Sequence, residues 1–467
     1  MGKEYRVRCK GLDAEGRGIV EFNGRKFAIK GLLPGELATM ELVYRAKDTG
    51  ARLCQVLELS PDRVEPACSV FDKCGGCQLL HMSEEAQKEF KQGLCEELLG
   101  GFGKVRPILT AENPKNYRNK VHAAFARKRM GGAPGGKGTG AYKSGKGGPA
   151  GRSRIISGIF EEESHRVIET TDCLIQDKRA AEYLRTVRKL MQDTHTEPYN
   201  EDTGRGTLRY VFLRTGRKSG EVLMALVTGT TEFPAKLKFA AEIRKKHPEI
   251  VTLIHNINPQ KNSMVLGKKE TVLYGAGYIT DMLCGHTFRI SVNSFYQVNS
   301  EQTEVLYQTA VELAKLTKND TVIDAYCGIG TITLMAADYA GKVIGVEVNA
   351  QAVKDAKDNA KRNNCTNAEF ICQDAGAFMR EQAKKGTVPQ VVIMDPPRAG
   401  SDDAFLSSLV TMAPERVVYI SCNPETQARD LKKLTAKGYQ VEVIQPVDMF
   451  PGTKHVETVV LLVKKEM

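Results

Sequence analysis

The sequence predicts an α/β protein that ends in a doubly wound sheet of the class I methyltransferase type and begins with a small β-barrel. Three observations support this prediction. Strand and helix patterns alternate after about residue 300, short alternating strands fill the first 60 residues, and a cysteine-bearing region of mixed pattern lies between them. The chain has 467 residues, so we expect domains at 1–60, 61–275 and 276–467.

The N-terminal segment has the alternation and the turns of a small barrel. A hairpin is expected at Asn23-Gly24, because both residue types tolerate the left-handed backbone that a tight turn needs. Leu33-Pro-Gly-Glu provides a second turn, and alternation resumes at 37–42. About five short strands are expected, which is enough for a small barrel.

The central segment combines a helix, an insertion and further strands. A charged helix is predicted from about Ser83 to Leu99. Residues 130–154 are basic and rich in glycine, a composition that cannot bury a core and predicts a flexible loop. Strand-like alternation returns between 205 and 290.

Positive charge is concentrated in one part of the chain. The formal net charge is +11, and the segment 113–160 contains eleven Lys or Arg and no Asp or Glu. Such a concentration favours a polyanion partner, most simply nucleic acid, whereas the alternative is a solubilising loop. The expected phosphate contacts are Lys115, Arg118, Lys120, Arg127, Lys128 and Arg129.

The sequence shows no sign of a membrane protein or of disulfide bonds. It has no run of 18 or more apolar residues, and its first residues lack an apolar signal core. We therefore expect a cytoplasmic protein whose twelve cysteines are reduced. They must serve as core residues, metal ligands or nucleophiles.

The C-terminal segment has the texture of a doubly wound domain. Helical patterns fill most gaps between its strands. The last two strands have no helix between them, which predicts a hairpin. The expected strands are 321–325, 342–347, 368–372, 390–395, 416–421, 439–447 and 456–464.

Three successive strand ends carry the features of a cofactor site. The first strand runs into a turn with two glycines, ending at Gly330, where a ligand can approach the backbone closely. Glu347 follows Asp324 by 23 residues, the spacing that places a carboxylate at ribose hydroxyls. Gln373-Asp374 ends the third strand, where an acid can meet an adenine edge. NAD fits this geometry, but the missing third glycine favours S-adenosylmethionine.

The next two strands end in reactive groups. The fourth ends in Asp395-Pro-Pro-Arg398, where an aromatic residue in place of Arg398 would indicate methylation of an exocyclic amine. The fifth ends in Ser421-Cys422-Asn-Pro. Because ligands bind at the carboxyl ends of such strands, Cys422 is a candidate nucleophile rather than a buried small side chain.

Together these motifs resemble the RNA uracil-5 methyltransferases. The resemblance covers nearly the whole chain, the N-terminal segment being similar to a TRAM domain, an RNA-binding module. The glycine-rich insertion is the main departure. The matching motifs are Phe295-Tyr-Gln-Val-Asn299, Asp324-Ala-Tyr-Cys-Gly-Ile-Gly, Asp395-Pro-Pro-Arg-Ala-Gly, Ser421-Cys-Asn-Pro and His455-Val-Glu457.

The resemblance implies a role for each site residue. Cys422 would be the nucleophile that adds to carbon 6 of uracil, and Glu457 the base that removes the proton at carbon 5. The order of strands in this fold places the start of the seventh beside the end of the fifth. His455 is the competing base. The residues implied at the cofactor are Gln297, Tyr326, Thr331, Glu347, Asp374 and Asp395, of which Thr331 and Asp374 could instead be ordinary turn or cap residues.

Cys68-x5-Cys74-Gly-Gly-Cys77 can hold a metal, which requires a fourth ligand. The resemblance points to Cys173, with Cys95 as a rival on a predicted helix. Spacing alone leaves structural zinc and an iron–sulfur cluster open, and the resemblance implies a 4Fe-4S cluster.

Three functions compete at this stage. A TRAM-like barrel with a cysteine cluster resembles the branch that acts on 23S rRNA, which is the leading prediction. The second keeps the chemistry and changes the substrate to tRNA. The third is a non-catalytic RNA-binding iron–sulfur protein. The oligomeric state is not predicted.

Overall fold

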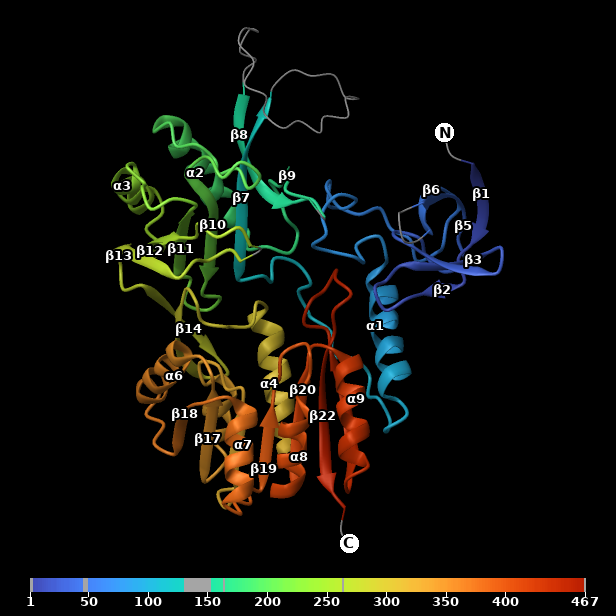
Figure 1. Ribbon diagram of the computed structural model, residues 1–467, viewed down its shortest axis with the longest axis vertical. Coiled ribbons are helices and arrows are strands. Elements are labelled where there is room, and N and C mark those ends of the chain that lie inside the picture. Colours follow the sequence, from blue (N-terminus) through green and yellow to red (C-terminus); the bar gives the residue numbers. More distant parts are fainter. Residues whose placement is uncertain (1–2, 45–48, 130–152, 163, 263, 466–467) are drawn as a thin grey trace.

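The C-terminal part of the chain is built on one seven-stranded sheet (Figure 1). The computed structural model describes residues 3–44, 49–129, 153–162, 164–262 and 264–465. The sheet order is β18-β17-β16-β19-β20-β22-β21, and β22 runs antiparallel to both of its neighbours. This confirms the predicted doubly wound sheet and its C-terminal hairpin. The strands are β16 (Thr321–Ala325), β17 (Lys342–Glu347), β18 (Ala368–Cys372), β19 (Val391–Met394), β20 (Arg416–Ser421), β21 (Tyr439–Val447) and β22 (Glu457–Lys464).

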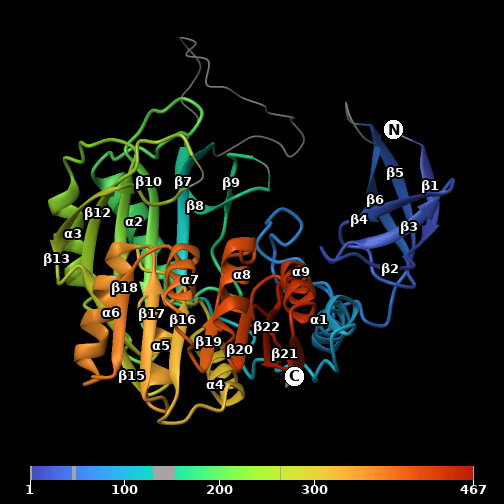
Figure 2. The ribbon, with the colours of Figure 1, turned by 60° about the horizontal axis from the view of Figure 1, so that its bottom comes forward.

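Helices cover both faces of this sheet (Figure 2). Successive strand residues point to opposite faces, so Val322 packs with α4, α5 and α6, whereas Ile323 packs with α7, α8 and α9. The inner strands β16, β19, β20 and β22 are therefore buried along most of their length, whereas the edge strands β18 and β21 have exposed residues. The helices are α4 (Ser300–Ala314), α5 (Thr331–Ala337), α6 (Ala350–Arg362), α7 (Ala375–Lys384), α8 (Asp403–Met412) and α9 (Pro424–Thr435).

A second seven-stranded sheet forms the central part, in the order β13-β12-β11-β10-β7-β8-β9. One face packs against α2 (Ala180–Asp193) and α3 (Lys236–Lys246). From the other face, Phe212 and Ile254 join the core of the C-terminal part, together with the hairpin of β14 (Tyr278–Leu283) and β15 (His286–Ser291). The strands are β7 (Lys120–Arg129), β8 (Ser153–Phe160), β9 (Val167–Glu169), β10 (Leu208–Thr215), β11 (Val222–Thr228), β12 (Ile250–Ile257) and β13 (Lys269–Tyr274).

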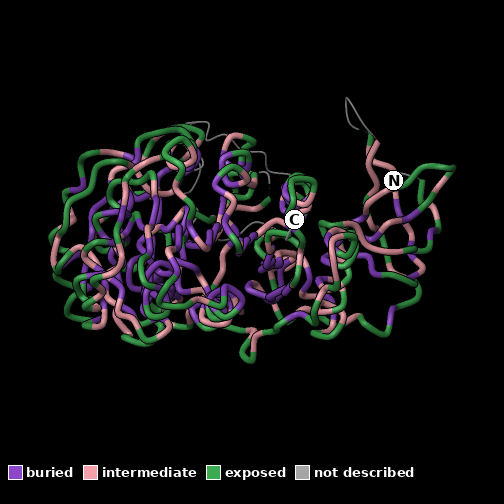
Figure 3. Tube along the Cα trace, turned by 90° about the horizontal axis from the view of Figure 1, so that it is seen from below, coloured by how far each residue is buried: buried purple, intermediate pink, exposed green. Residues whose placement is uncertain are grey.

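The glycine-rich insertion predicted at 130–154 lies, up to residue 152, outside the described residues. Strand β7 leads into it and β8 resumes after it. In Figure 3 the buried trace lies mostly inside the larger part of the molecule, and exposed trace surrounds it. No helix in the described ranges has the length and apolar character needed to cross a bilayer.

The N-terminal module, residues 3–60, pairs its strands into two three-stranded sheets over one small core. The sequence predicted a single barrel of about five strands. The hairpin at Asn23-Gly24 is confirmed, with φ of 50° and 72° at its two turn residues. The strands are β1 (Glu4–Arg8), β2 (Gly11–Leu12), β3 (Gly18–Phe22), β4 (Arg25–Ile29), β5 (Leu37–Tyr44) and β6 (Thr49–Glu58).

Helix α1 (Glu84–Leu99) links this module to the C-terminal sheet. Its first turn is capped by the Ser83 hydroxyl, which accepts from the Ala86 amide at 3.2 Å. Lys91, Cys95 and Leu99 are its buried residues. The helix agrees with the one predicted from the charged pattern.

Candidate active site

The turn between β16 and α5 is shaped by glycine. Gly328 and Gly330 have φ of 56° and 86°, a region that side chains rarely adopt. A Cβ on Gly330 would lie 3.0 Å from the Phe370 ring, so this position also lacks space. The Gly328 amide donates to the Glu347 carboxylate at 3.2 Å. The turn and the acid at the end of β17 therefore meet at one edge of the sheet.

Asp324 lies beneath this turn and is fully buried. One carboxylate oxygen accepts from the Thr333 hydroxyl at 2.5 Å, and the other has no hydrogen-bond partner among the described residues. Burial raises the pKa of Asp324 to about 7, Thr333 opposes this shift and Glu347 adds to it. A buried polar atom without a partner is costly, so the site fits a ligand that brings its own donors.

Tyr326 forms one wall of the same edge. It is a non-glycine residue with φ of 76°, a strained conformation of the kind that persists at functional sites. Its ring centroid lies 5.6 Å from that of Phe405, and its hydroxyl lies 3.4 Å from the Ser401 hydroxyl. Burial raises the pKa of Tyr326, and the charge of Asp374 contributes to the shift. Asp374 also caps α7 through the Ala377 amide at 2.9 Å, so the cap role considered for it is present.

Cys422 and Glu457 meet at the ends of two adjacent strands. Ser421 at the end of β20 is paired in register with Thr458 of β22, and the two strands are antiparallel. The residue after Ser421 therefore lies beside the residue before Thr458, although 35 positions separate them in the sequence. The predicted position of the seventh strand beside the fifth is confirmed.

Two carboxylates and one guanidinium surround the Cys422 thiol. Burial, Glu457 and Asp395 raise the pKa of Cys422 to about 11, and the charge and hydrogen bond of Arg398 oppose this shift. Glu457 is 2% exposed, and burial and Asp395 hold its pKa well above the ordinary value. Burial and Asp324 raise the pKa of Asp395 to about 7. Without a ligand, this group retains protons at neutral pH, and Arg398 is the cation that favours the thiolate.

Replacing Arg398 with Gln is expected to raise the pKa of Cys422, because the cation that stabilises its thiolate is lost. Alkylation of this thiol by iodoacetamide near pH 8 should slow by roughly threefold to tenfold. The measurement is the pH dependence of the alkylation rate, followed by mass spectrometry on the peptide that contains Cys422. The exposed thiol of Cys372 serves as an internal reference. An unchanged or lower midpoint would contradict the role of Arg398.

Tyr307 on α4 lies between predicted cofactor residues and the carboxylates of Asp395 and Glu457. It is buried, and its pKa is raised by burial and by Asp395, while hydrogen bonding with Thr331 and Gln297 opposes the shift. The two predicted residues Thr331 and Gln297 are thus brought together by a side chain that the sequence did not single out. The one available signal was an aromatic residue within a helical pattern. The sequence indicated Arg398 only as the residue at a position where an aromatic side chain would point to methylation of an amine.

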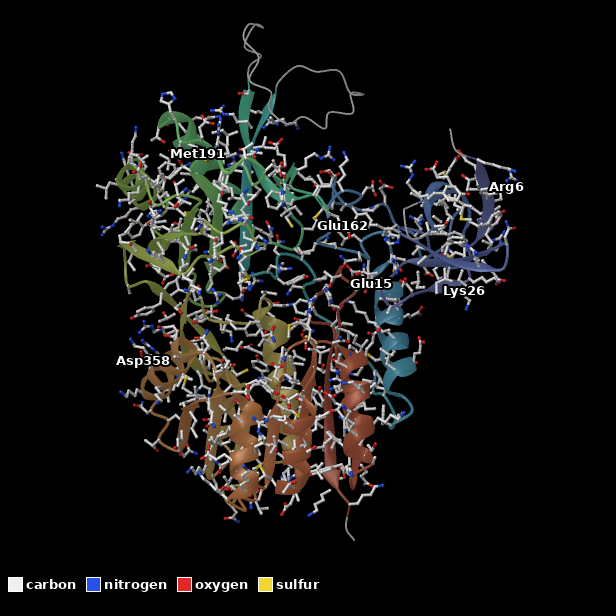
Figure 4. The ribbon with its side chains drawn as sticks, viewed as in Figure 1. Arg6, Glu15, Lys26, Glu162, Met191 and Asp358 are labelled. Carbon is white, nitrogen blue, oxygen red and sulfur yellow. The ribbon has the colours of Figure 1, made fainter. Side chains whose placement is uncertain are left out.

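Cys422 opens onto a pocket of about 230 Å³ with walls from distant parts of the chain. The N-terminal module contributes Glu15, which forms an ion pair with Lys454 in the loop before β22 (Figure 4). No local sequence pattern predicts this contact. The lining residues are Ala14, Glu15, Leu94, Leu98, Arg398, Cys422, Asn423, Pro424, Glu425, Lys454, His455 and Val456.

The loop between β21 and β22 is held from several sides. The buried Lys91 ammonium lies 2.5 Å from the Asp448 carboxylate, and the Tyr117 hydroxyl donates to the Pro451 carbonyl at 3.0 Å. The Gly452 carbonyl accepts amides from the cysteine-bearing segment, the nearest from Leu79 at 3.0 Å. This loop ends at Glu457, so its anchoring fixes the position of that carboxylate.

His455, the competing base, lies on the same loop and lines the Cys422 pocket. Burial and the neighbouring Arg398 lower the pKa of His455 to about 4. A base with so low a pKa holds a proton weakly at neutral pH. Efficient proton transfer favours a pKa near the working pH, so this geometry favours Glu457.

The four cysteines singled out in the sequence line one cavity of about 350 Å³. The residues are Cys68, Cys74, Cys77 and Cys173. Burial and the other three thiols raise the pKa of Cys77 to about 12. Cys95, the rival ligand, is instead buried with Ile108 and Val456. Within the described ranges, no three or more His, Cys, Asp or Glu side chains are placed to hold a metal ion.

The glycine turn, the acids at successive strand ends and the thiol at the edge of the sheet define a class I methyltransferase that uses S-adenosylmethionine. Residues 262–465 match the model of the tRNA (uracil-5-)-methyltransferase family. An uncharacterized RNA methyltransferase of Halalkalibacterium halodurans is 40% identical over 98% of this chain and 96% of its own length. An uncharacterized RNA methyltransferase of Listeria innocua is 39% identical over 97% of this chain and 96% of its own length. The chain belongs to the RNA (uracil-5)-methyltransferase family, so it is an enzyme.

A solved structure extends this similarity to the fold. The tRNA (uracil-54, C5)-methyltransferase of Pyrococcus abyssi, in complex with S-adenosyl-L-homocysteine, matches with a TM-score of 0.76. The two chains are 25% identical, and the match covers 98% of this chain and 100% of that chain. The family assignment supports S-adenosylmethionine as methyl donor and excludes the non-catalytic alternative.

Proposed function

We propose that this enzyme methylates carbon 5 of a uridine in 23S rRNA through a covalent adduct with Cys422. The observation that carries the chemistry is the adjacency of Cys422 and Glu457 at neighbouring strand ends. Asp395 and Arg398 influence both groups. A nucleophile, a base and a cation that stabilises the thiolate are the groups that this reaction requires.

The proposed reaction follows from these groups. The Cys422 thiolate forms a bond to carbon 6 of uracil, and the electron pair of the 5,6 double bond moves toward the carbonyl oxygen at carbon 4. Carbon 5 then takes the methyl group, which S-adenosylmethionine supplies as a sulfonium. Glu457 removes the proton from carbon 5, the double bond re-forms and the thiolate leaves. The target base must first be turned out of its stack, a cost that contacts with flanking RNA offset.

We assign the cofactor to the edge described above, on the residues that the sequence singled out. The unpartnered oxygen of Asp324 and the glycine turn support this placement. Tyr326 and Glu347 would flank the adenosine, and Asp395 would lie at the junction with uracil. The full assignment is Gln297, Tyr326, Thr331, Glu347, Asp374 and Asp395.

We assign a 4Fe-4S cluster to Cys68, Cys74, Cys77 and Cys173. The four thiols line one cavity, and four cysteine thiolates are the ligand set that holds such a cluster. A bound cluster supplies a redox centre, but methyl transfer moves no net electrons, so we assign it a structural role. The Cys77 sulfur lies 4.0 Å from where a Cβ on Gly452 would be, so the cluster would brace the loop that ends at Glu457. Iron and sulfide in the purified protein test this assignment, and zinc without iron would refute it.

The choice of 23S rRNA rests on the N-terminal module, which we take as TRAM-like, and on the cysteine cavity beside it. A tRNA substrate is the second candidate. The Pyrococcus abyssi enzyme described above acts on tRNA, and the structural match with this chain covers its whole length. The basic segment around β7 suits either RNA.

Mapping of 5-methyluridine separates the two substrates. In a strain that lacks the gene, 23S rRNA should lose 5-methyluridine at one or more positions while tRNA is unchanged. Expression of the parent protein should restore the modification, and Cys422→Ala should not. Loss from tRNA alone would move the assignment to the second candidate.

A further inference from the structure

Strand β7 presents an ammonium group and an imidazole on one face of the central sheet. Lys120 and His122 are alternate residues and so face the same side of the sheet, opposite Arg214 and Phe212 of β10. Among the described residues, the Lys120 and His122 side chains form no hydrogen bond or ion pair. Arg214 is 2% exposed; it donates to the Ser294 carbonyl at 2.8 Å, and its Nε is unpartnered.

Lys120 and Arg214 are the two positive charges of this group. Burial, Arg214 and Arg118 lower the pKa of Lys120 to about 8. Burial lowers the pKa of Arg214 to about 10. The pKa of His122 is lowered to about 4, so its exposed imidazole is neutral and acts as a hydrogen-bond donor. Buried charges are normally paired, so the buried Arg214 beside the half-buried Lys120 favours an anion from outside the chain.

Lys120 and His122 line the 350 Å³ cavity whose opposite wall holds the four cysteines. The far end is apolar and aromatic: the half-buried Phe160 ring lies edge-on to Tyr210, with centroids 6.2 Å apart, and Val265 is adjacent. Of the two carboxylates in the lining, Glu169 is paired with Arg154 at 2.5 Å. The second, Asp172, is exposed.

The cluster assigned to the cysteines does not account for these groups. Arg118 is the cation that lowers the pKa of the Cys77 thiol, and it precedes β7 on the cysteine side. Lys120 is two residues and His122 four residues further along the chain, about 7 and 13 Å from Arg118. The cavity therefore has a cationic and aromatic part beyond the thiols.

The segment that leads into β7 is bonded to the segment that bears Gln297. The Asn119 amide group donates to the Gln297 carbonyl at 2.9 Å, and the Asn119 backbone amide donates to the Val298 carbonyl at 2.8 Å. Gln297 is a residue of the proposed cofactor edge. The position of this wall of the cavity is therefore coupled to that of the cofactor edge.

We propose that the cavity is a subsite for a second unpaired RNA nucleotide, a neighbour of the target uridine, with its phosphate on Lys120 and His122 and its base on Phe160. Arg214 adds positive charge from behind the phosphate. This inference rests on the proposed function only in that RNA is the ligand. Anchoring a neighbouring base would help to turn the uridine out of its stack.

Binding of a short single-stranded RNA tests the proposal. The probe is a fluorescein-labelled oligoribonucleotide with one uridine between adenosines, titrated with the intact protein at about 50 and 200 mM salt. Lys120→Gln should weaken binding by roughly tenfold and lower the salt slope by about one. Lys245→Gln, a charge-matched change at an exposed position on α3, should leave both unchanged. Equal affinities for the three proteins, or no measurable binding, would overturn the proposal.

A second probe reports on the base. With 2-aminopurine in place of either adenosine next to the uridine, one of the two positions should be quenched by stacking in the parent protein. Phe160→Leu should remove the quenching and weaken binding by about fivefold to tenfold, whereas Phe160→Tyr should keep both. Iron and sulfide contents must match those of the parent, and a loss of cluster in Lys120→Gln would assign this cation to the cluster instead. Methylation of RNA by the parent protein checks the proposed function separately.

Discussion

Replacing Cys422 with Ala is expected to lower the rate of RNA methylation by roughly four orders of magnitude or more. Carbon 5 of uracil is a poor nucleophile, and the thiolate addition at carbon 6 is the step that activates it. Without the sulfur at the end of β20, no other group in the 230 Å³ pocket can form this bond readily. The measurement is transfer of labelled methyl groups from S-adenosylmethionine to RNA.

A covalent adduct provides a second readout. With RNA that contains 5-fluorouridine, the proton at carbon 5 is replaced by fluorine, so the reaction stops after methyl transfer and the protein stays attached to the RNA. The parent protein should give a band of protein and RNA on a denaturing gel, and Cys422→Ala should not. Cys365 is half-buried, as Cys422 is, so Cys365→Ala is a matched control and should form the adduct normally. An adduct that persists in Cys422→Ala would place the nucleophile elsewhere.

The C-terminal sheet could be predicted because its information is local. Strands such as β20 and β22 are buried on both faces, so their apolar runs stand out from the polar links. The strand order then placed Cys422 beside Glu457, and the pairing of Ser421 with Thr458 agrees. The strand order of this fold thus predicts that two motifs far apart in the sequence form one site.

The N-terminal module was less predictable, because short strands have little apolar pattern and their pairing depends on contacts between sheets. The sequence could indicate the Asn23-Gly24 hairpin but not the division into two sheets. Long-range contacts at the active site gave no signal either. The ion pair of Glu15 with Lys454 joins residues 439 positions apart and depends on how the module docks.

The cysteine cavity shows the same limit. Three thiols lie close together in the sequence, whereas Cys173 reaches them only through the fold. Its rival Cys95 lies nearer in sequence but is turned into an apolar group by α1. Helix orientation, and not spacing, separates these two residues.

Replacing Glu457 with Gln is expected to slow the release of methylated RNA by about a hundredfold to ten-thousandfold, the usual contribution of a general base. Thiol addition and methyl transfer do not need this carboxylate, so the covalent intermediate should accumulate on ordinary uridine RNA. Gln has nearly the same shape as Glu, and it carries no charge at a site where burial disfavours the ionised carboxylate. The fold should therefore tolerate the change. The measurement is the lifetime of the adduct after rapid mixing and denaturation.

The pH dependence of release identifies the base. Glu457 must be ionised to accept the proton, and because its folded pKa is raised, release by the parent protein should become faster as pH rises toward that pKa. In Glu457→Gln this rise should disappear from the release step. His455, whose pKa is lowered to about 4, would already be neutral across the same range and would give no such rise. His455→Asn should therefore slow release by at most about tenfold. A different outcome would contradict this assignment: the adduct accumulates in His455→Asn and not in Glu457→Gln. The imidazole would then be the base, and Glu457, with Asp395 and Arg398, would set the charge around Cys422.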